Sequence, residues 1–162
     1  MGLMLLLAVP SNAATTSNNT INYQMIVGTT LVVVCPGATL GGPVNLGTYD
    51  AGSTPTGTAV SCTVTQNRNT GVMTITASPA ANSITLTDGG APADTINVNF
   101  SGYSYTGGGT LAGGGSFASG LSVTNPRRGN SNFNYTATPA AIPSGQAAGT
   151  YTGNHTLTFS LI

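Results

Sequence analysis

Charged side chains are almost missing from this chain of 162 residues. They make up 4% of the sequence, as three Arg and three Asp with neither Lys nor Glu, so the formal net charge is zero. Nucleic-acid binding depends on many basic contacts to phosphate, so the composition argues against such a partner. Low charge also accompanies disorder, but disordered chains usually lack apolar residues, whereas 40% of this sequence is hydrophobic. We therefore expect a folded domain.

Strong helix formers are also scarce. Glu and Lys are absent, whereas Gly is abundant at 23 residues and Thr and Asn are frequent. This balance disfavours long helices and favours short strands joined by tight turns. The length suits one domain with one hydrophobic core and is too short for two ordinary domains. The composition therefore predicts a single all-β domain.

Groups that carry catalysis or bind metals are few. His155 is the only histidine, and no G-x-S-x-G motif supports a Ser-His-Asp arrangement. A carboxylate pair or a calcium site could come only from Asp50, Asp88 and Asp94, and Asp88-Gly89 is a favoured turn dipeptide without a calcium-loop pattern. Two cysteines and a distant histidine fall short of four zinc ligands. We expect no catalytic residue, no metal and no cofactor, and we expect His155 to be half-buried near the end of the chain.

The first thirteen residues are similar to a secretory signal. An apolar run over residues 3–9 is followed by Pro10 and then by Ser11 and Ala13, which have the small-x-small spacing of a cleavage site. No Lys or Arg precedes the run, so the true start of the signal stays open. A buried strand is the alternative, since the run is far shorter than the roughly 20 residues that span a bilayer. We expect residues 1–13 to be removed and the protein to be secreted.

Cys35 and Cys62 are the only cysteines in the chain. An even number of cysteines in an exported protein predicts a disulfide. Closing a loop of this length would stabilise the fold by about 3 to 4 kcal/mol. Two buried free thiols are the alternative.

Apolar and polar residues alternate repeatedly along the chain, and each alternating run is bounded by Gly, Pro, Asn or Asp. This period of two predicts strands rather than helices. Residues 31–35 form a continuous apolar run, which predicts a strand that is covered on both faces. We expect strands at residues 21–27, 31–35, 59–65, 72–77, 83–87, 95–100, 121–124, 133–137 and 150–162.

The first and the last of these runs have clear faces. One face of residues 21–27 carries Ile21, Tyr23, Met25 and Val27, and one face of residues 150–162 carries Tyr151, His155, Leu157, Phe159 and Leu161. Many short strands at such spacing predict a sandwich of the immunoglobulin-like kind.

A Gly-rich segment, residues 102–120, predicts a flexible loop outside the core. Its aromatic residues and the adjacent arginines of the NPRRG sequence are our candidates for surface contacts with a sugar, a glycan or a neighbouring subunit: Tyr103, Tyr105, Phe117, Arg127 and Arg128. The alternatives are packing over a hairpin for the aromatic residues and a solvated turn for the arginines.

Two stretches carry a resemblance to a known family. VNLGTYDAGSTPTGTAVSC follows Cys35 and ends at Cys62, and IPSGQAAGTYTGNHTLTFSLI closes the chain. Together they resemble the spore coat protein U family, which includes subunits of archaic chaperone-usher pili. The family phrase FGxYD matches residues 46–50, although Leu46 replaces the usual Phe, and the GTY before the last strand also matches. The resemblance covers roughly half of the chain, and residues 67–134 lie outside it.

The resemblance implies a fold and a mode of assembly. It implies an immunoglobulin-like sandwich that lacks its final strand, with a groove beside the last strand at Tyr151, Leu157, Phe159 and Leu161. In such pili the N-terminal extension of the next subunit fills the groove, a form of β-augmentation. Here the donor residues would be Ile21, Tyr23, Met25 and Val27. The implied partners are copies of the chain itself, a periplasmic chaperone and an outer-membrane usher, with a host or abiotic surface as a further contact.

These expectations divide the chain into a signal peptide at 1–13, a donor extension at 14–28 and a β-sandwich domain at 29–162. The predicted function is that of a structural subunit of an extracellular pilus, exported through the periplasm, for attachment or biofilm formation. The alternative is a monomeric secreted carbohydrate-binding module or adhesin. Periodicity also leaves open whether the N-terminal strand pairs within its own domain or with another subunit.

Overall fold

The structure, a computed structural model, describes residues 24–25, 28–37, 43–112 and 115–162. Regular structure in these ranges consists of nine β-strands, and no helix occurs there. Accordingly, no helix in the described ranges is long and apolar enough to span a membrane. The prediction of an all-β chain is confirmed.

The strands are short and follow one another closely along the chain. Their bounds are β1 Leu31–Val34, β2 Thr58–Gln66, β3 Val72–Ser78, β4 Ser83–Thr87, β5 Thr95–Thr106, β6 Thr110–Ala112, β7 Leu121–Thr124, β8 Gly129–Pro139 and β9 Thr156–Leu161.

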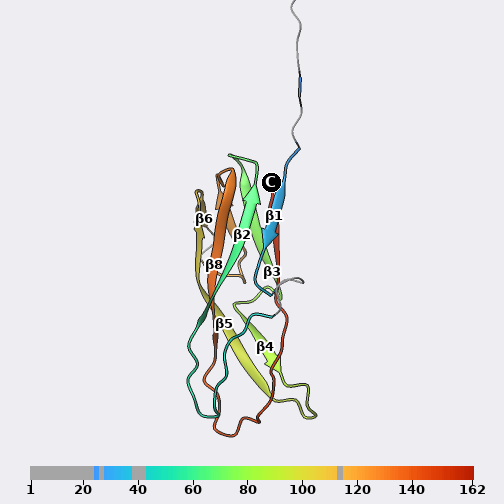
Figure 1. Ribbon diagram of the computed structural model, residues 1–162, viewed down its shortest axis with the longest axis vertical. Coiled ribbons are helices and arrows are strands. Elements are labelled where there is room, and N and C mark those ends of the chain that lie inside the picture. Colours follow the sequence, from blue (N-terminus) through green and yellow to red (C-terminus); the bar gives the residue numbers. More distant parts are fainter. Residues whose placement is uncertain (1–23, 26–27, 38–42, 113–114) are drawn as a thin grey trace, which may run out of the picture.

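Two antiparallel sheets contain all nine strands (Figure 1). The first has the order β1-β2-β8-β5-β4, and the second has the order β6-β7-β3-β9. The register of β5 on β8 shifts between Ser101 and Ser104, where Gly102 has a positive φ of 65°. Such an irregularity bends a strand. β5 therefore pairs with β8 on both sides of the irregularity, and its first residues, Thr95 to Asn99, also pair with β4 at one end of the molecule.

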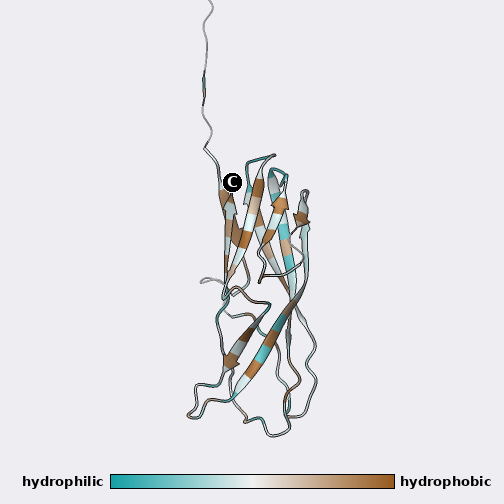
Figure 2. Cartoon of the chain, turned by 180° about the vertical axis from the view of Figure 1, so that it is seen from behind, coloured by the Kyte–Doolittle hydropathy of each residue, from teal (hydrophilic) through white to brown (hydrophobic). Residues whose placement is uncertain are grey.

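Side chains from the two sheets share a single core. On β2 the alternation is strict, because Val60, Cys62 and Val64 are buried while their neighbours are exposed. The same alternation runs along the other strands, where brown and paler residues succeed one another in Figure 2. The opposing sheet contributes Met73, Ile75, Leu121 and Val123, and the first sheet adds Val98, Phe100, Phe133 and Ala137.

The strand predictions succeed where alternation is strong. The strands at residues 83–87 and 121–124 are confirmed to the residue, and those at 59–65 and 72–77 are confirmed to within one residue at each end. The strands predicted at 95–100 and 133–137 exist but are longer, as β5 and β8. The predicted strand at 150–162 is shorter, as β9. Residues 21–23 and 26–27 lie outside the described ranges.

The prediction of a flexible loop at residues 102–120 is wrong for much of the segment. It contains the end of β5 and all of β6. Phe117 is 1% exposed and packs edge-on against Phe100, with their ring centroids 5.8 Å apart. Gly107, Gly108 and Gly109 form the tight turn between the two strands with positive φ. The glycines are therefore required by backbone geometry and close packing, which a composition-based rule interprets as flexibility.

The prediction that residues 31–35 are covered on both faces is also wrong. Leu31 and Val33 face the core side and are half-buried, whereas Val32 and Val34 are 52% and 63% exposed. An apolar run carries no alternation, so its sequence alone does not reveal which face of the strand is left open.

The predicted disulfide is present. Cys35 immediately follows β1 and Cys62 lies in β2, and their Sγ atoms are bonded with a Cα–Cα distance of 4.1 Å. The bond attaches the end of β1 to the neighbouring strand and closes a loop with a sequence separation of 27 residues. It therefore fixes the chain where it leaves the edge of the first sheet.

Candidate functional site

The two sheets each end in a strand with an unpaired edge. In the described part of the chain β1 pairs only with β2, at one end of its sheet, and β9 pairs only with β3, at one end of the other sheet. Figure 1 shows β1 beside the C-terminal strand, and no hydrogen-bonded ladder joins β1 and β9 within the described ranges. One side of the domain therefore has two strand edges with free backbone donors and acceptors.

A long groove lies along this side of the domain. Its volume is about 1520 Å³, and it is lined by residues from both edge strands, from β4 and β5 and from the segments at 43–51 and 146–155. The apolar lining includes Leu31, Val33, Val44, Leu46, Ile84, Leu86, Val98, Phe100, Tyr135, Leu157 and Phe159. An apolar groove of this kind is a site for a ligand or for another segment of polypeptide.

Burial along the edge strands differs from burial at the centre of the sheet. The inward residues of β2 are 0 to 2% exposed, from Val60 to Val64. The inward residues of β1 and β9 are only half-buried, including Leu31, Leu157 and Phe159. The same sheets bury apolar side chains fully elsewhere. The incomplete burial of the inward residues of β1 and β9 therefore indicates that further side chains would fit against these two strands.

Neither edge strand carries the features that usually prevent edge-to-edge association. Natural sheets protect open edges with charged residues, with Pro or with bulges. β1 reads LVVV and β9 reads TLTFSL, so neither strand contains a charged residue or a Pro. These edges are therefore suited to pairing with an added strand.

His155 lies just before β9 and lines the groove. Its ring stacks on Phe100 with centroids 4.4 Å apart and an interplanar angle of 15°, and it contacts Phe117 at 4.9 Å. Both ring nitrogens are shielded from solvent and have no hydrogen-bond partner. Burial lowers the pKa of His155, while the nearby Pro79 carbonyl opposes the shift without forming a hydrogen bond. The ring is therefore neutral at pH 7 and contributes an aromatic face to the groove lining. Its half-buried position agrees with the expectation from the sequence.

The groove extends to the end of the domain where β4 lies. Thr87 and Thr152 form an isolated bridge with two backbone hydrogen bonds of 2.9 Å, which joins the segment before β9 to β4. The Tyr151 hydroxyl donates to the Ala147 carbonyl at 2.8 Å and accepts from Gln146 Nε2 at 2.7 Å. These bonds hold the segment at 146–152 as the wall of the groove at this end.

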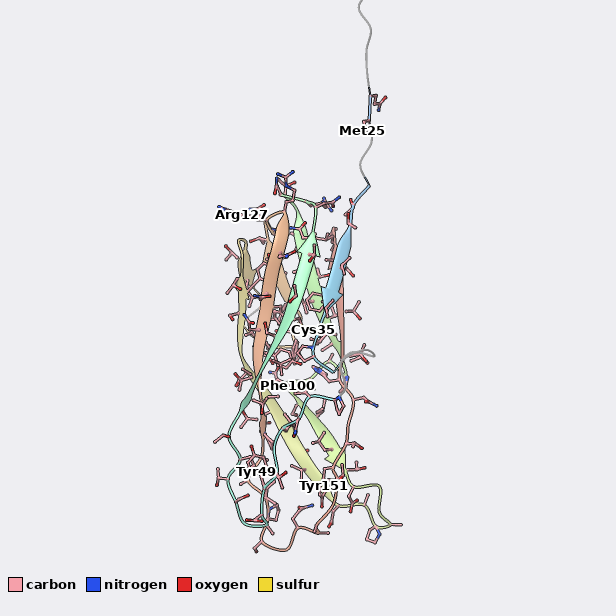
Figure 3. The ribbon with its side chains drawn as sticks, in the orientation of Figure 1. Met25, Cys35, Tyr49, Phe100, Arg127 and Tyr151 are labelled. Atoms are coloured by element: carbon pink, nitrogen blue, oxygen red, sulfur yellow. A yellow bond between two sulfur atoms is a disulfide. The ribbon has the colours of Figure 1, made fainter. Side chains whose placement is uncertain are left out.

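The N-terminal extension leaves the domain at the opposite end. Asn67 holds it there, because its Oδ1 accepts from the Thr30 backbone at 2.8 Å and its Nδ2 donates to the Gly28 carbonyl at 2.7 Å. Met25 lies beyond the end of the two sheets in Figure 3 and is 86% exposed. Of the predicted donor residues, Met25 therefore makes little contact with its own domain. The other three, Ile21, Tyr23 and Val27, lie outside the described residues.

The structure places the predicted acceptor residues in two groups. Tyr151, Leu157 and Phe159 line the groove, whereas Leu161 packs against the core beyond the lining. The contributions of β1, β4, β5 and the segment at 43–51 were not predicted. Periodicity identified the inward faces of these strands, but it does not state which strands lie at sheet edges.

The candidates for surface contacts do not form one surface. Phe117 is in the core, which corrects its assignment as a surface residue. Tyr103 and Tyr105 are half-buried and pack against the core. Burial raises the pKa of Tyr103, whose hydroxyl donates to Asn82 Oδ1 at 3.2 Å. The adjacent Arg127 and Arg128 are exposed in the turn before β8.

No group of three or more His, Cys, Asp or Glu side chains comes together as a metal site among the described residues. Comparisons with protein-family models, with curated proteins and with solved structures found no match for this chain. The groove, the open strand edges and the extension are therefore the features that point to a function.

Proposed function

We propose that this chain is the structural subunit of an extracellular fibre, in which the N-terminal extension of one copy fills the groove of the next by donor-strand complementation. The observation that carries the proposal is the groove between the open edges of β1 and β9, which both lack charged residues and Pro. An added strand would pair with free backbone groups on both sides and cover half-buried apolar side chains. The domain would then be an immunoglobulin-like sandwich completed by a donated strand.

The extension has the properties that this role requires. Its apolar residues alternate over 21–27, which is the pattern of a strand with one buried face. Met25 is exposed in the subunit, so its burial is available to an intermolecular contact. Burying the four residues Ile21, Tyr23, Met25 and Val27 would contribute about 6 to 12 kcal/mol, an upper bound before ordering costs. Export through the periplasm with a chaperone and an usher follows from the resemblance to archaic pilins.

A monomeric carbohydrate-binding module has less support. Such a site would need exposed aromatic rings for stacking on sugars. Phe117 is buried, and Tyr103 and Tyr105 pack against the core. The groove, in contrast, is bordered by strand edges, which favours a polypeptide occupant.

Electron microscopy and gel electrophoresis of the exported full chain test the proposal. We expect fibres, and we expect a ladder of oligomers that collapses to a monomer on boiling. Leu157→Asp places a charge in the groove and should abolish the ladder, whereas Ser160→Asp, on the exposed face of the same strand and outside the groove lining, should retain it. Circular dichroism would establish that both variants fold. Wild-type protein that is found only as dispersed monomers would contradict the proposal.

A further inference from the structure

All six charged side chains lie at the two ends of the domain, sorted by sign. Arg68 is in the turn between β2 and β3, and Arg127 and Arg128 are in the turn before β8. These two turns are joined, because Arg128 N donates to Asn69 Oδ1 at 2.9 Å and Gln66 Nε2 donates to the Arg127 carbonyl. The three positive charges of the chain therefore share one end, which we call the Arg end.

The three carboxylates lie at the other end. Asp88 and Asp94 close the loop between β4 and β5, where Asp88 Oδ1 accepts from the backbone of Asp94 at 3.0 Å. Asp50 is in a turn whose Gly52 donates to the Ile142 carbonyl at 3.0 Å, just past the end of β8. Arg127 and Tyr49, the neighbour of Asp50, lie at opposite ends of the molecule in Figure 3. We call this the Asp end.

The length of β8 separates the two ends. β8 runs from Gly129, next to the arginines, to Pro139, near the Asp50 turn. Its 11 residues span roughly 35 Å, several times the screening length of about 8 to 10 Å at physiological salt. No ion pair forms among the described residues, which include all six charged side chains. The charges are therefore free to act on another molecule.

The extension leaves the domain at the Arg end, since Asn67, which holds Gly28 and Thr30, is adjacent to Arg68. An extension could enter the groove of a second copy from either end. Entry at the Arg end would allow two copies to exchange extensions as a closed pair. The three positive charges of one copy would then face, and repel, the three positive charges of the other. Entry at the Asp end would place opposite charges together and leave a free extension for the next copy.

We infer that the charged ends orient successive copies of this chain head to tail, so that the Arg end of one copy docks on the Asp end of the next. The inference rests on the proposed function, to which it adds the contact outside the groove. Opposite charges on approaching surfaces speed association and select orientation, and both effects weaken with salt. Ile162 also lies at the Arg end, where its backbone exchanges two hydrogen bonds with the backbone of Val72. A terminal carboxylate on Ile162 would reduce the charge of the Arg end from +3 to +2, and the charge would stay positive.

The test is the salt dependence of polymerisation of the full chain, followed by light scattering between 20 and 500 mM NaCl. For the wild type we expect the initial rate to fall about tenfold across this range. R127Q/R128Q removes two positive charges from the Arg end and should polymerise more slowly at low salt, with less than about a twofold fall. S61E/T63E is the matched control, since it also gives a net charge of −2 but places its charges on the exposed face of β2, and it should keep the wild-type salt dependence.

Folding is checked separately, because the stem of Arg127 packs over Gly108. Arg128→Gln leaves that packing intact and should give an intermediate salt dependence. The inference would be overturned, while the proposed function stands, by either of two results. Fibres could form at an initial rate that does not change with salt, or the rates of R127Q/R128Q and S61E/T63E could change equally with salt. Closed dimers in place of fibres would overturn both, as would wild-type protein that stays monomeric at every salt concentration.

Discussion

The role of Met25 distinguishes a fibre subunit from a self-complete monomer. Met25 is 86% exposed in the subunit, so nearly all the free energy of burying its side chain would be gained at the junction between copies. Full burial of a Met side chain contributes about 1.5 to 3 kcal/mol. Met25→Ala should therefore weaken each junction by about 2 kcal/mol, which is about a 30-fold increase in the dissociation constant.

Met25→Asp is the sharper form of this perturbation. A carboxylate in an apolar groove would cost several kcal/mol and should abolish polymers, while the melting temperature of the isolated subunit should stay within about 1 °C of wild type. Gln24→Asp is the matched control, because Gln24 is also exposed and, in the predicted donor strand, faces away from Met25, so its substitution should leave assembly intact. The assays are the boiling-sensitive ladder for assembly and thermal unfolding for the subunit. An unfolded Met25→Asp subunit, with wild-type protein found only as monomers, would refute the reasoning.

Three further predictions concern the stability of the subunit. Replacing Cys35 and Cys62 together by Ala should cost about 3 to 4 kcal/mol in denaturant unfolding, and unchanged stability would contradict a structural role for the disulfide. Gly109→Ala should lower the free energy of unfolding by about 1 to 3 kcal/mol, because φ at Gly109 is +103° and an added Cβ would lie 2.8 Å from Val123 Cγ1. Gly145→Ala is the control, since a Cβ there meets open space and should leave stability unchanged. Equal melting temperatures of the two variants would refute this prediction. Because burial lowers the pKa of His155, the unfolded chain binds more protons, so stability should be full above the ordinary pKa of 6.5 and should fall as pH drops below it. His155→Phe should flatten this dependence in melting curves from pH 5 to 8, and an identical slope in both proteins would exclude His155 as its source.

Much of the fold follows from local patterns in the sequence. Alternation and the turn residues at their ends predict the strands that have one face toward the core, such as β2 and β4. The disulfide also follows, because two cysteines in a chain that carries a predicted secretory signal most often pair. The core face of the last strand was predicted through the phase of Leu157 and Phe159.

The errors arise where composition conflicts with three-dimensional packing. Gly107 to Gly109 were interpreted as flexible, yet they allow β5 to turn into β6 where Ser131 and Arg127 approach the backbone closely. Phe117 was interpreted as exposed because of its Gly-rich surroundings, but its ring fills the core. In both cases contacts between residues far apart in the sequence decide the structure, and the local sequence does not predict such contacts.

The groove was only half predicted for a related reason. A resemblance pointed to the last strand, but the opposite wall is formed by β1, which the sequence suggested was covered on both faces. Which strands are edges depends on the pairing order, and pairing order is a property of the whole chain. The same limit applied to the extension, since alternation at residues 21–27 is identical for pairing within the domain or with another copy.

The charges show how a feature can be visible in the composition and still have no meaning until the fold is known. Three Arg and three Asp give a net charge of zero, which on its own suggests an electrostatically neutral subunit. Antiparallel strands carry Arg68 and Arg127 to one end and Asp50 and Asp88 to the other, so the neutral chain has opposite charges at its two ends. The sides between them, which carry no charged residue in the described ranges, leave the ends as the source of the electric field of the subunit. In the proposed fibre, a subunit of this kind would have a direction, and an extension anchored at one end by Asn67 would give assembly the same direction.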